Sequence, residues 1–140
     1  MKKVAVFSMV LGMAVLMVAG CATTAKGPSD EEQIRQRIQE GIAGLKAKNY
    51  DLFGGMVSEN FSSGVIGDKN DLLDYLKNAD GMGFLDDLEV FLEDAVITVE
   101  GETATVEPVD VSGSFGSLSL NFTGAKEKGV WMVSGVEPGY

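Results

Sequence analysis

The chain has 140 residues, with 11 basic and 21 acidic side chains and no histidine. Its net charge of −10 repels phosphate backbones and anionic lipid head groups, which argues against nucleic-acid binding. The absence of histidine removes the commonest general base, the commonest zinc ligand and every serine–histidine or cysteine–histidine pair. We therefore expect neither a metal nor a cofactor.

The first 20 residues have the three-part layout of a secretory signal peptide. Lys2 and Lys3 give a basic start, an apolar stretch runs from Val4 to Val18, and small residues follow. The apolar stretch is shorter than the roughly 20 residues that a membrane-spanning helix needs. We predict a signal peptide over residues 1–20.

The end of this segment, Val18-Ala19-Gly20-Cys21, resembles the lipobox of bacterial lipoproteins. In that family a diacylglycerol is attached to the cysteine thiol, and the signal peptide is cut just before the cysteine. The resemblance implies cleavage between Gly20 and Cys21 and lipidation of Cys21, the only cysteine in the chain. Each buried methylene contributes roughly 0.8 kcal/mol, so the diacylglycerol and an amide-linked chain would anchor the protein essentially permanently.

Residues 21–28 form a lipidated tether in this interpretation. Ala22 to Pro28 span about 25 Å when fully extended, which keeps the following domain near the membrane. Ala22 is not the aspartate that resembles an inner-membrane retention signal in enteric bacteria. In a two-membrane cell this implies the outer membrane, with the domain facing the periplasm, and in a single-membrane cell it implies the outer surface. Removal of residues 1–20 takes two lysines and no acid, which leaves a net charge of −12.

A long amphipathic helix is predicted from Ser29 onwards. Ser29 can cap it, and Glu32 stands three residues later, as a capping box requires. One apolar stripe follows at helical spacing, made of Ile34, Ile38, Ile42 and Leu45. Gly41 and Gly44, three residues apart on this helix, predict a place where a strand crosses closely.

Two further helices are predicted. Asn49-Tyr50-Asp51 interrupts the first pattern, and Asp51 is expected to cap a short helix that carries Leu52, Phe53, Met56 and Val57. A short strand is expected over residues 61–66. A third helix begins at Asp68-Lys69-Asn70-Asp71 and ends at Gly81-Met82-Gly83.

The remaining residues predict a strand meander. Leu88 to Val99 reads as one long strand with a break at Glu93-Asp94, and Glu100-Gly101 as a tight turn. Residues 103–111 return as a strand in which Pro108 predicts an edge or a bulge. Alternation over residues 118–123 predicts a strand with one buried face, and a last strand surrounds Trp131.

Helices followed by a meander predict an α+β fold, with the N-terminal helices packed on one face of a curved antiparallel β-sheet. The Tyr50-Asp51 turn, the Gly-Glu-Thr-Ala-Thr-Val turn at 101–106 and the Gly-Val-Trp-Met-Val ending at 129–133 make residues 29–137 resemble the nuclear transport factor 2-like superfamily. That superfamily, the cystatin-like cone, includes SnoaL-like and ketosteroid-isomerase-like proteins. The resemblance implies one domain over residues 29–140, with an apolar pocket at the open end of the cone. It also makes a homodimer through the open sheet face an expectation.

Three functions stay open at this point. The first is a non-catalytic, lipid-anchored cone domain that binds a small apolar ligand or a protein partner at the cell envelope. The second is an isomerase- or dehydratase-like enzyme with an aspartate base, for which Asp51 is the acid best placed, although no catalytic residue carries over from the family. The third is a purely structural envelope lipoprotein whose pocket is filled by its own side chains.

Candidate ligand-binding residues are the large aromatic side chains that could line the mouth of the cone: Tyr50, Phe53, Phe84 and Trp131. An acidic run from Asp86 to Asp94 lacks the glycine-centred loop of a calcium-binding EF-hand, so we predict no metal site there.

Overall fold

The computed structural model describes residues 27–140. The predicted cleavage site, Cys21 and most of the tether lie outside the described residues, so processing and lipidation stay predictions. Within residues 27–140, no helix is long and apolar enough to cross a membrane.

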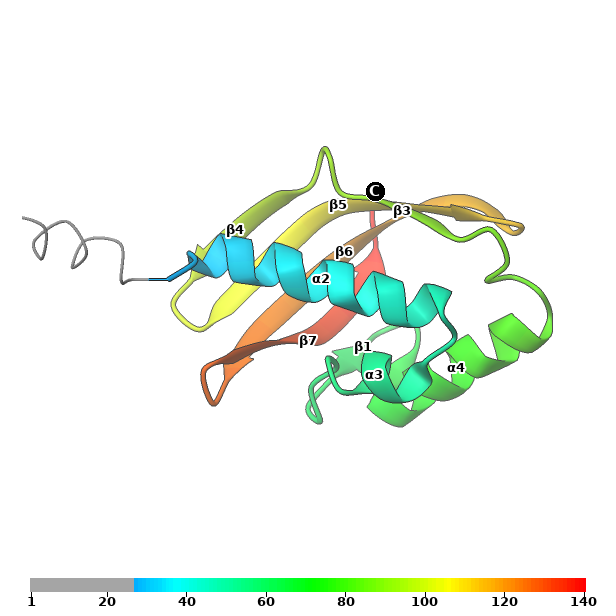
Figure 1. The fold of residues 1–140 in the computed structure, drawn as a ribbon, viewed down its shortest axis with the longest axis horizontal. Coiled ribbons are helices and arrows are strands. Elements are labelled where there is room, and N and C mark those ends of the chain that lie inside the picture. The colour runs from blue at the N-terminus through cyan, green and yellow to red at the C-terminus, as the bar shows by residue number, and fades with distance from the viewer. Residues whose placement is uncertain (1–26) are drawn as a thin grey trace, which may run out of the picture.

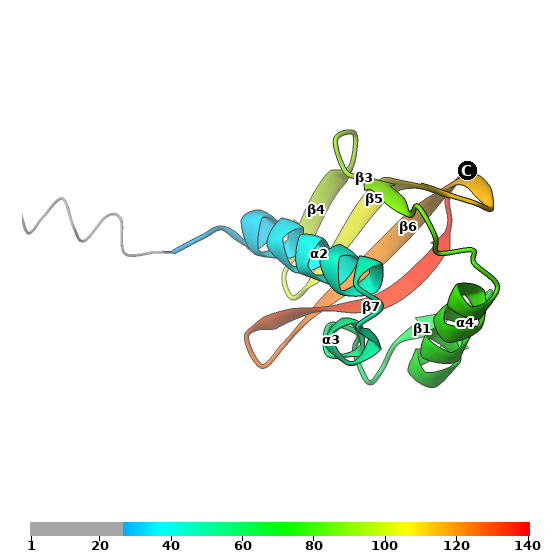
Figure 2. The ribbon, with the colours of Figure 1, turned by 45° about the vertical axis from the view of Figure 1, so that its right-hand side comes forward.

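The domain consists of an antiparallel sheet with helices on its concave face (Figures 1 and 2). The helices are α2 (Asp30–Lys46), α3 (Tyr50–Gly54) and α4 (Lys69–Gly81), and a two-stranded ribbon of β1 (Ser62–Ser63) and β2 (Gly67–Asp68) lies between α3 and α4 in sequence. The main sheet contains β3 (Glu89–Phe91), β4 (Val96–Glu100), β5 (Thr103–Gly113), β6 (Gly116–Glu127) and β7 (Val130–Pro138). Both β3 and β4 pair with β5, which pairs with β6, which pairs with β7. The predicted fold class is confirmed.

Helix α2 begins as the sequence predicts, because the Ser29 hydroxyl accepts a hydrogen bond from the Glu32 backbone N–H at 3.2 Å. The prediction for its glycines is wrong in one respect. A Cβ on Gly41 would lie 3.3 Å from Met56 Sδ, and one on Gly44 would lie 3.2 Å from Leu52 Cδ2. The close approach is therefore made by α3 and the residues just after it, and not by a strand.

The cap of α3 is Asn49 and not Asp51. Asn49 Oδ1 accepts from the Leu52 N–H at 3.1 Å, while Asp51 lies exposed within the first helical turn. Asparagine caps helices as well as aspartate does, and it stands at the position from which a side chain reaches the free N–H groups. The start of α4 agrees with its prediction, since Asp68 and Asp71 form a reciprocal capping box.

The predicted strand over residues 88–99 is divided. Phe91 pairs with Asp110 and Val96 with Glu107, so residues 92–95 on the edge lie opposite only residues 108 and 109 of β5. The pairing of β5 with β6 also shifts register between Val106 and Val109. Pro108 therefore marks a bulge, as predicted, but in a strand that is paired on both sides.

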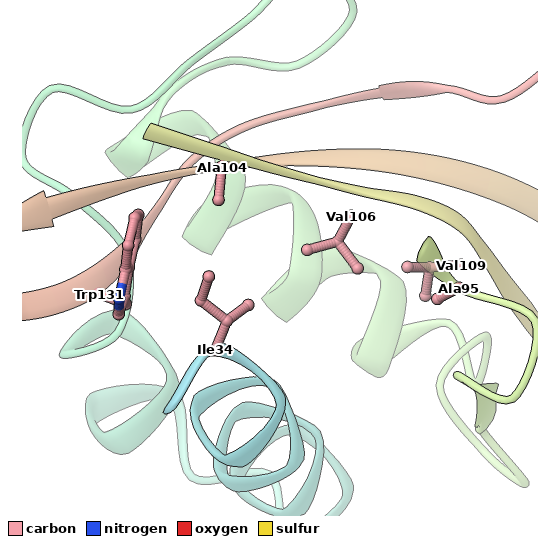
Figure 3. Close-up of a cluster of buried hydrophobic side chains, with 6 residues drawn as sticks. All are labelled: Ile34, Ala95, Ala104, Val106, Val109 and Trp131. Carbon is pink, nitrogen blue, oxygen red and sulfur yellow. The ribbon is translucent and has the colours of Figure 1, made fainter. Parts of the chain in front are cut away.

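Two clusters of buried side chains fill the space between the helices and the sheet. In the first, Ile34 of α2 lies between Trp131 and Val106 in the view of Figure 3. The second joins Val57, Phe61 and Leu72 to Val136 of β7. Trp131 is only 3% exposed, and Val57 and Val109 are fully enclosed.

Candidate functional site

The four aromatic residues predicted to bind a ligand lie in four different places. Trp131 is part of the first core cluster. Its Nε1 donates a hydrogen bond to Asp30 Oδ1 at 3.1 Å, and Lys126 Nζ lies 3.0 Å from the same oxygen. The hydrogen bond from Lys126, followed by the one from Trp131, lowers the pKa of Asp30. This arrangement fixes the start of α2 to β6 and β7.

Tyr50 lies at the joint between the α2–α3 turn and α4. Its hydroxyl is buried against Asp80 without a well-aligned hydrogen bond, and Lys48 Nζ lies 2.7 Å from Asp80 Oδ1. Lys48, followed by the Tyr50 hydroxyl, lowers the pKa of Asp80, and burial, followed by the Asp80 carboxylate, raises the pKa of Tyr50. Phe53 packs against the second core cluster. Both aromatic rings thus contribute to the packing of helices.

Phe84 is placed differently, at the end of the sheet where β5 turns into β6. Ser114 Oγ donates to the Gly83 carbonyl at 2.7 Å, so the loop between α4 and β3 lies against the β5–β6 turn. A Cβ on Gly113 would lie 2.8 Å from the Phe115 ring and 3.2 Å from the Phe84 carbonyl oxygen. Phe84 is 43% exposed and Phe115 is 38% exposed.

Leu118 extends this apolar surface along the concave face. It pairs with Val111, which packs against the first core cluster, and paired residues of neighbouring strands share a face. Unlike Val111, which is partly buried, Leu118 is 43% exposed. We call the surface formed by Phe84, Phe115 and Leu118 the mouth.

An open groove of about 350 Å³ lies between α2 and the edge of the sheet. Its lining includes Ile42, Ala43 and Lys46 of α2 together with Val90, Leu92 and Glu93. Val90 pairs with Val111, which pairs with Leu118, so the groove and the mouth belong to one face of the sheet. A second, hydroxyl-lined depression of about 320 Å³ lies on the other face, where Thr98, Thr105 and Thr123 are among its lining residues.

Carboxylates of the described residues lie outside the core. None of them is fully buried, and Asp51, the candidate base, is exposed on α3. Within residues 27–140, no three histidine, cysteine, aspartate or glutamate side chains are grouped as a metal site. The described surface offers apolar contact at the mouth, with acidic side chains around it.

The comparison with known proteins rests on structure, because no protein-family model and no curated protein matches the sequence. A protein of unknown function with a cystatin-like fold from Nostoc punctiforme superposes with a TM-score of 0.61 at 15% identity, over 78% of this chain and 89% of that one. A nuclear transport factor 2-like protein of unknown function from Pseudomonas putida gives 0.62 at 13% identity, over 79% and 87%. A similar protein from Shewanella oneidensis gives 0.62 at 14% identity, over 77% and 97%.

The fold is the nuclear transport factor 2-like cone. At these identities the likeness concerns the fold alone, and a fold of this kind hosts many functions. The function must therefore be argued from the mouth and from the charges around it.

Two residues of the mouth escaped sequence reasoning. Phe115 stands in Ser112-Gly113-Ser114-Phe115-Gly116, between the strands predicted over residues 103–111 and 118–123, and no role was predicted for it. A large aromatic residue within a short glycine-serine turn cannot be covered by its neighbours, and that signal could have revealed it. Leu118 was assigned to a buried face, because alternation shows which side a residue occupies and not whether a helix covers it.

Proposed function

We propose that this protein is a bacterial lipoprotein anchored through Cys21, and that its cone domain binds a protein partner at the mouth without catalysing a reaction. The observation that supports this function is the exposure of Phe84, Phe115 and Leu118 at one end of a cone that contains two packed core clusters. Exposed apolar side chains that gather in one place mark interaction sites, whereas scattered ones need no explanation.

The start of α2, which follows the predicted tether, and the mouth lie at opposite ends of the domain. Asp30 at the start of α2 contacts Lys126, whose N–H donates to the Glu102 carbonyl at 2.8 Å, so the β4–β5 turn shares the end where the tether enters (Figure 1). From that turn β5 runs for 11 residues to Gly113, about 35 Å at roughly 3.3 Å per residue. A lipid on Cys21 would therefore hold the mouth away from the membrane, within reach of other envelope proteins.

The anchor is tested by replacing the thiol. We expect the wild-type protein to fractionate with membranes and to carry an acylated N-terminal cysteine in mass spectra, and Cys21→Ser to lose both properties. The matched control is Ala22→Ser, which adds a hydroxyl one residue later and should behave as wild type. Membrane association of Cys21→Ser equal to that of the wild type would contradict the anchor.

Partner binding is tested by photo-crosslinking in the cells that make the protein. A benzophenone amino acid at position 118 should yield a discrete protein adduct. The control carries the same amino acid at position 98. Thr98 is also exposed but lies on the other face of the sheet, because its neighbours Ile97 and Val99 pack against the core. An adduct that forms equally from both positions, or from neither, would count against a binding site at the mouth.

The groove between α2 and the sheet edge supports a second candidate, a small apolar ligand. Its volume of about 350 Å³ lies within the range of small-molecule sites, and Ile42, Val90 and Leu92 line it. Native mass spectrometry of the mature protein, purified from cells without added ligands, should show a non-covalent adduct that denaturation releases. A clean mass of the protein alone would leave the protein partner as the stronger candidate.

A further inference from the structure

We propose that the partner segment received at the mouth is cationic, presenting lysine or arginine side chains beside its apolar ones. The inference rests on the proposed function and specifies the chemistry of the partner. The observation that supports it is the charge of the chain segments that form the mouth.

These segments contain no basic side chain. Between Lys77 and Lys126 the chain has ten acidic residues and neither lysine nor arginine. All three mouth residues, Phe84, Phe115 and Leu118, fall within this stretch. The mature net charge of −12 is thus not spread evenly, and this half of the domain carries acids that no neighbour in sequence balances.

Two of these acids stand directly beside the mouth. Asp86 and Asp87 follow Phe84 within three residues, and both are exposed. Lys48 Nζ lies 3.5 Å from Asp86 Oδ1, but it also lies 2.7 Å from Asp80 Oδ1, so one cation is shared by two carboxylates. Among the described residues, Asp87 has no ion pair. A positive charge on the partner would pair with these carboxylates, which have too few cations around them, next to the exposed aromatic rings.

The same charges disfavour other occupants. A second copy of the chain with its mouth on this one would bring Asp86 and Asp87 against their own counterparts, and like charges in contact oppose association. Anionic lipid head groups are repelled for the same reason. A cationic segment is the occupant that gains from both the apolar surface and the acids.

The test uses two synthetic peptides of about 14 residues with the same leucine pattern. In one peptide every polar position is lysine, and in the other every polar position is glutamate. Binding to the lipidated mature protein, residues 21–140, in neutral phosphatidylcholine nanodiscs is measured by fluorescence anisotropy, with empty nanodiscs as the blank. We expect the lysine peptide to bind, more weakly at about 200 mM than at about 20 mM salt, and the glutamate peptide not to bind. Equal binding of both peptides would overturn the proposal.

Matched variants separate a local effect from the attraction of a cation to any acidic protein. Asp86→Asn with Asp87→Asn should weaken binding of the lysine peptide about tenfold. Asparagine tolerates the positive φ of 59° that Asp87 adopts, so the loop is preserved. The control, Glu100→Gln with Glu102→Gln, removes two exposed acids at the tether end and should change affinity less than about twofold. Equal weakening by the two pairs would show attraction to overall charge and contradict the proposal.

Failure of the inference can be told apart from failure of the proposed function. The Asp86→Asn, Asp87→Asn variant and its control, Glu100→Gln, Glu102→Gln, are also used in the photo-crosslinking experiment from position 118. The double variant Phe84→Ser, Phe115→Ser is added to them. The account predicts that the serine variant and the Asp86→Asn, Asp87→Asn variant both lose the adduct. If only the serine variant loses it, the mouth binds a partner that is not cationic. If neither variant loses it, both proposals are wrong.

Discussion

The two ends of strand β5 differ in what covers them. At the tether end, Ala104 and Val106 are buried beneath Ile34 and Trp131. At the other end, Val111 is only partly buried and its cross-strand neighbour Leu118 is 43% exposed. The strand is apolar on its concave face at both ends, so the difference arises from the course of α2. Ile34 packs against the first end, whereas the last turns of α2 leave an open groove beside β3 (Figure 2). A single strand thus provides core at one end and surface at the other.

The largest predicted effect belongs to the buried end. Trp131→Ala would remove a ring that is 3% exposed and leave Asp30 without the indole N–H. We expect a loss of about 3–5 kcal/mol in the free energy of unfolding, measured by urea denaturation. Phe84→Ala is the comparison at the mouth and should cost less than about 1 kcal/mol. Similar losses for the two variants would remove the distinction between the ends.

Two glycines test the same comparison by the addition of a methyl group instead of the removal of a side chain. A Cβ on Gly135, which is buried in β7, would lie 2.6 Å from Thr123 Oγ1 and 3.0 Å from the Ser62 carbonyl oxygen. Gly135→Ala should therefore cost about 1–3 kcal/mol, because backbone has to shift. At the mouth, a Cβ on Gly113 would lie 2.8 Å from the Phe115 ring, which can rotate away, and 3.2 Å from the Phe84 carbonyl oxygen, which needs to move only by a few tenths of an ångström.

We therefore expect Gly113→Ala to destabilise the protein less than Gly135→Ala in the same denaturation experiment. Its main effect should be to displace Phe115 and so to reduce photo-crosslinking from position 118. A larger stability loss for Gly113→Ala would mean that the β5–β6 turn is packed as tightly as the interior of the sheet.

A smaller effect is expected from the carboxylate that fixes α2 to the sheet. Hydrogen bonds from Lys126 and Trp131 lower the pKa of Asp30 in the folded protein. A lowered pKa adds stability above the ordinary pKa of 3.8, and this contribution disappears as the pH falls through the folded value. The wild type should therefore lose more stability than Asp30→Asn between about pH 6 and about pH 3. Parallel pH profiles of the two proteins would show that Asp30 contributes nothing.

Much of the fold was predictable because short sequence signals mark where its helices and turns begin. Ser29, Asp68 and Gly101 mark a helix start, a second helix start and a turn, and each is where the structure has it. Two features were not predictable: that Asn49 caps α3, and that the segment lying close to Gly41 is α3 with the residues after it and not a strand. Both depend on how α3 packs against α2, which is a tertiary contact that no sequence window contains.

The mouth was predictable only in part. Phe84 was one of four large aromatic residues expected at the mouth of the cone, and the structure leaves it 43% exposed. Trp131 was expected there for its size alone, and the structure buries it instead. Whether an apolar side chain is covered depends on the reach of α2 along β5, and periodicity carries no information on that reach.

The most direct test of the account is the stability of the double variant Phe84→Ser, Phe115→Ser, measured by urea denaturation. If these rings serve binding, the free energy of unfolding should stay within about 1 kcal/mol of the wild-type value, because both are partly exposed before the change. A loss of about 3 kcal/mol or more would place both rings in the core and contradict the claim that this end of the sheet is a binding surface.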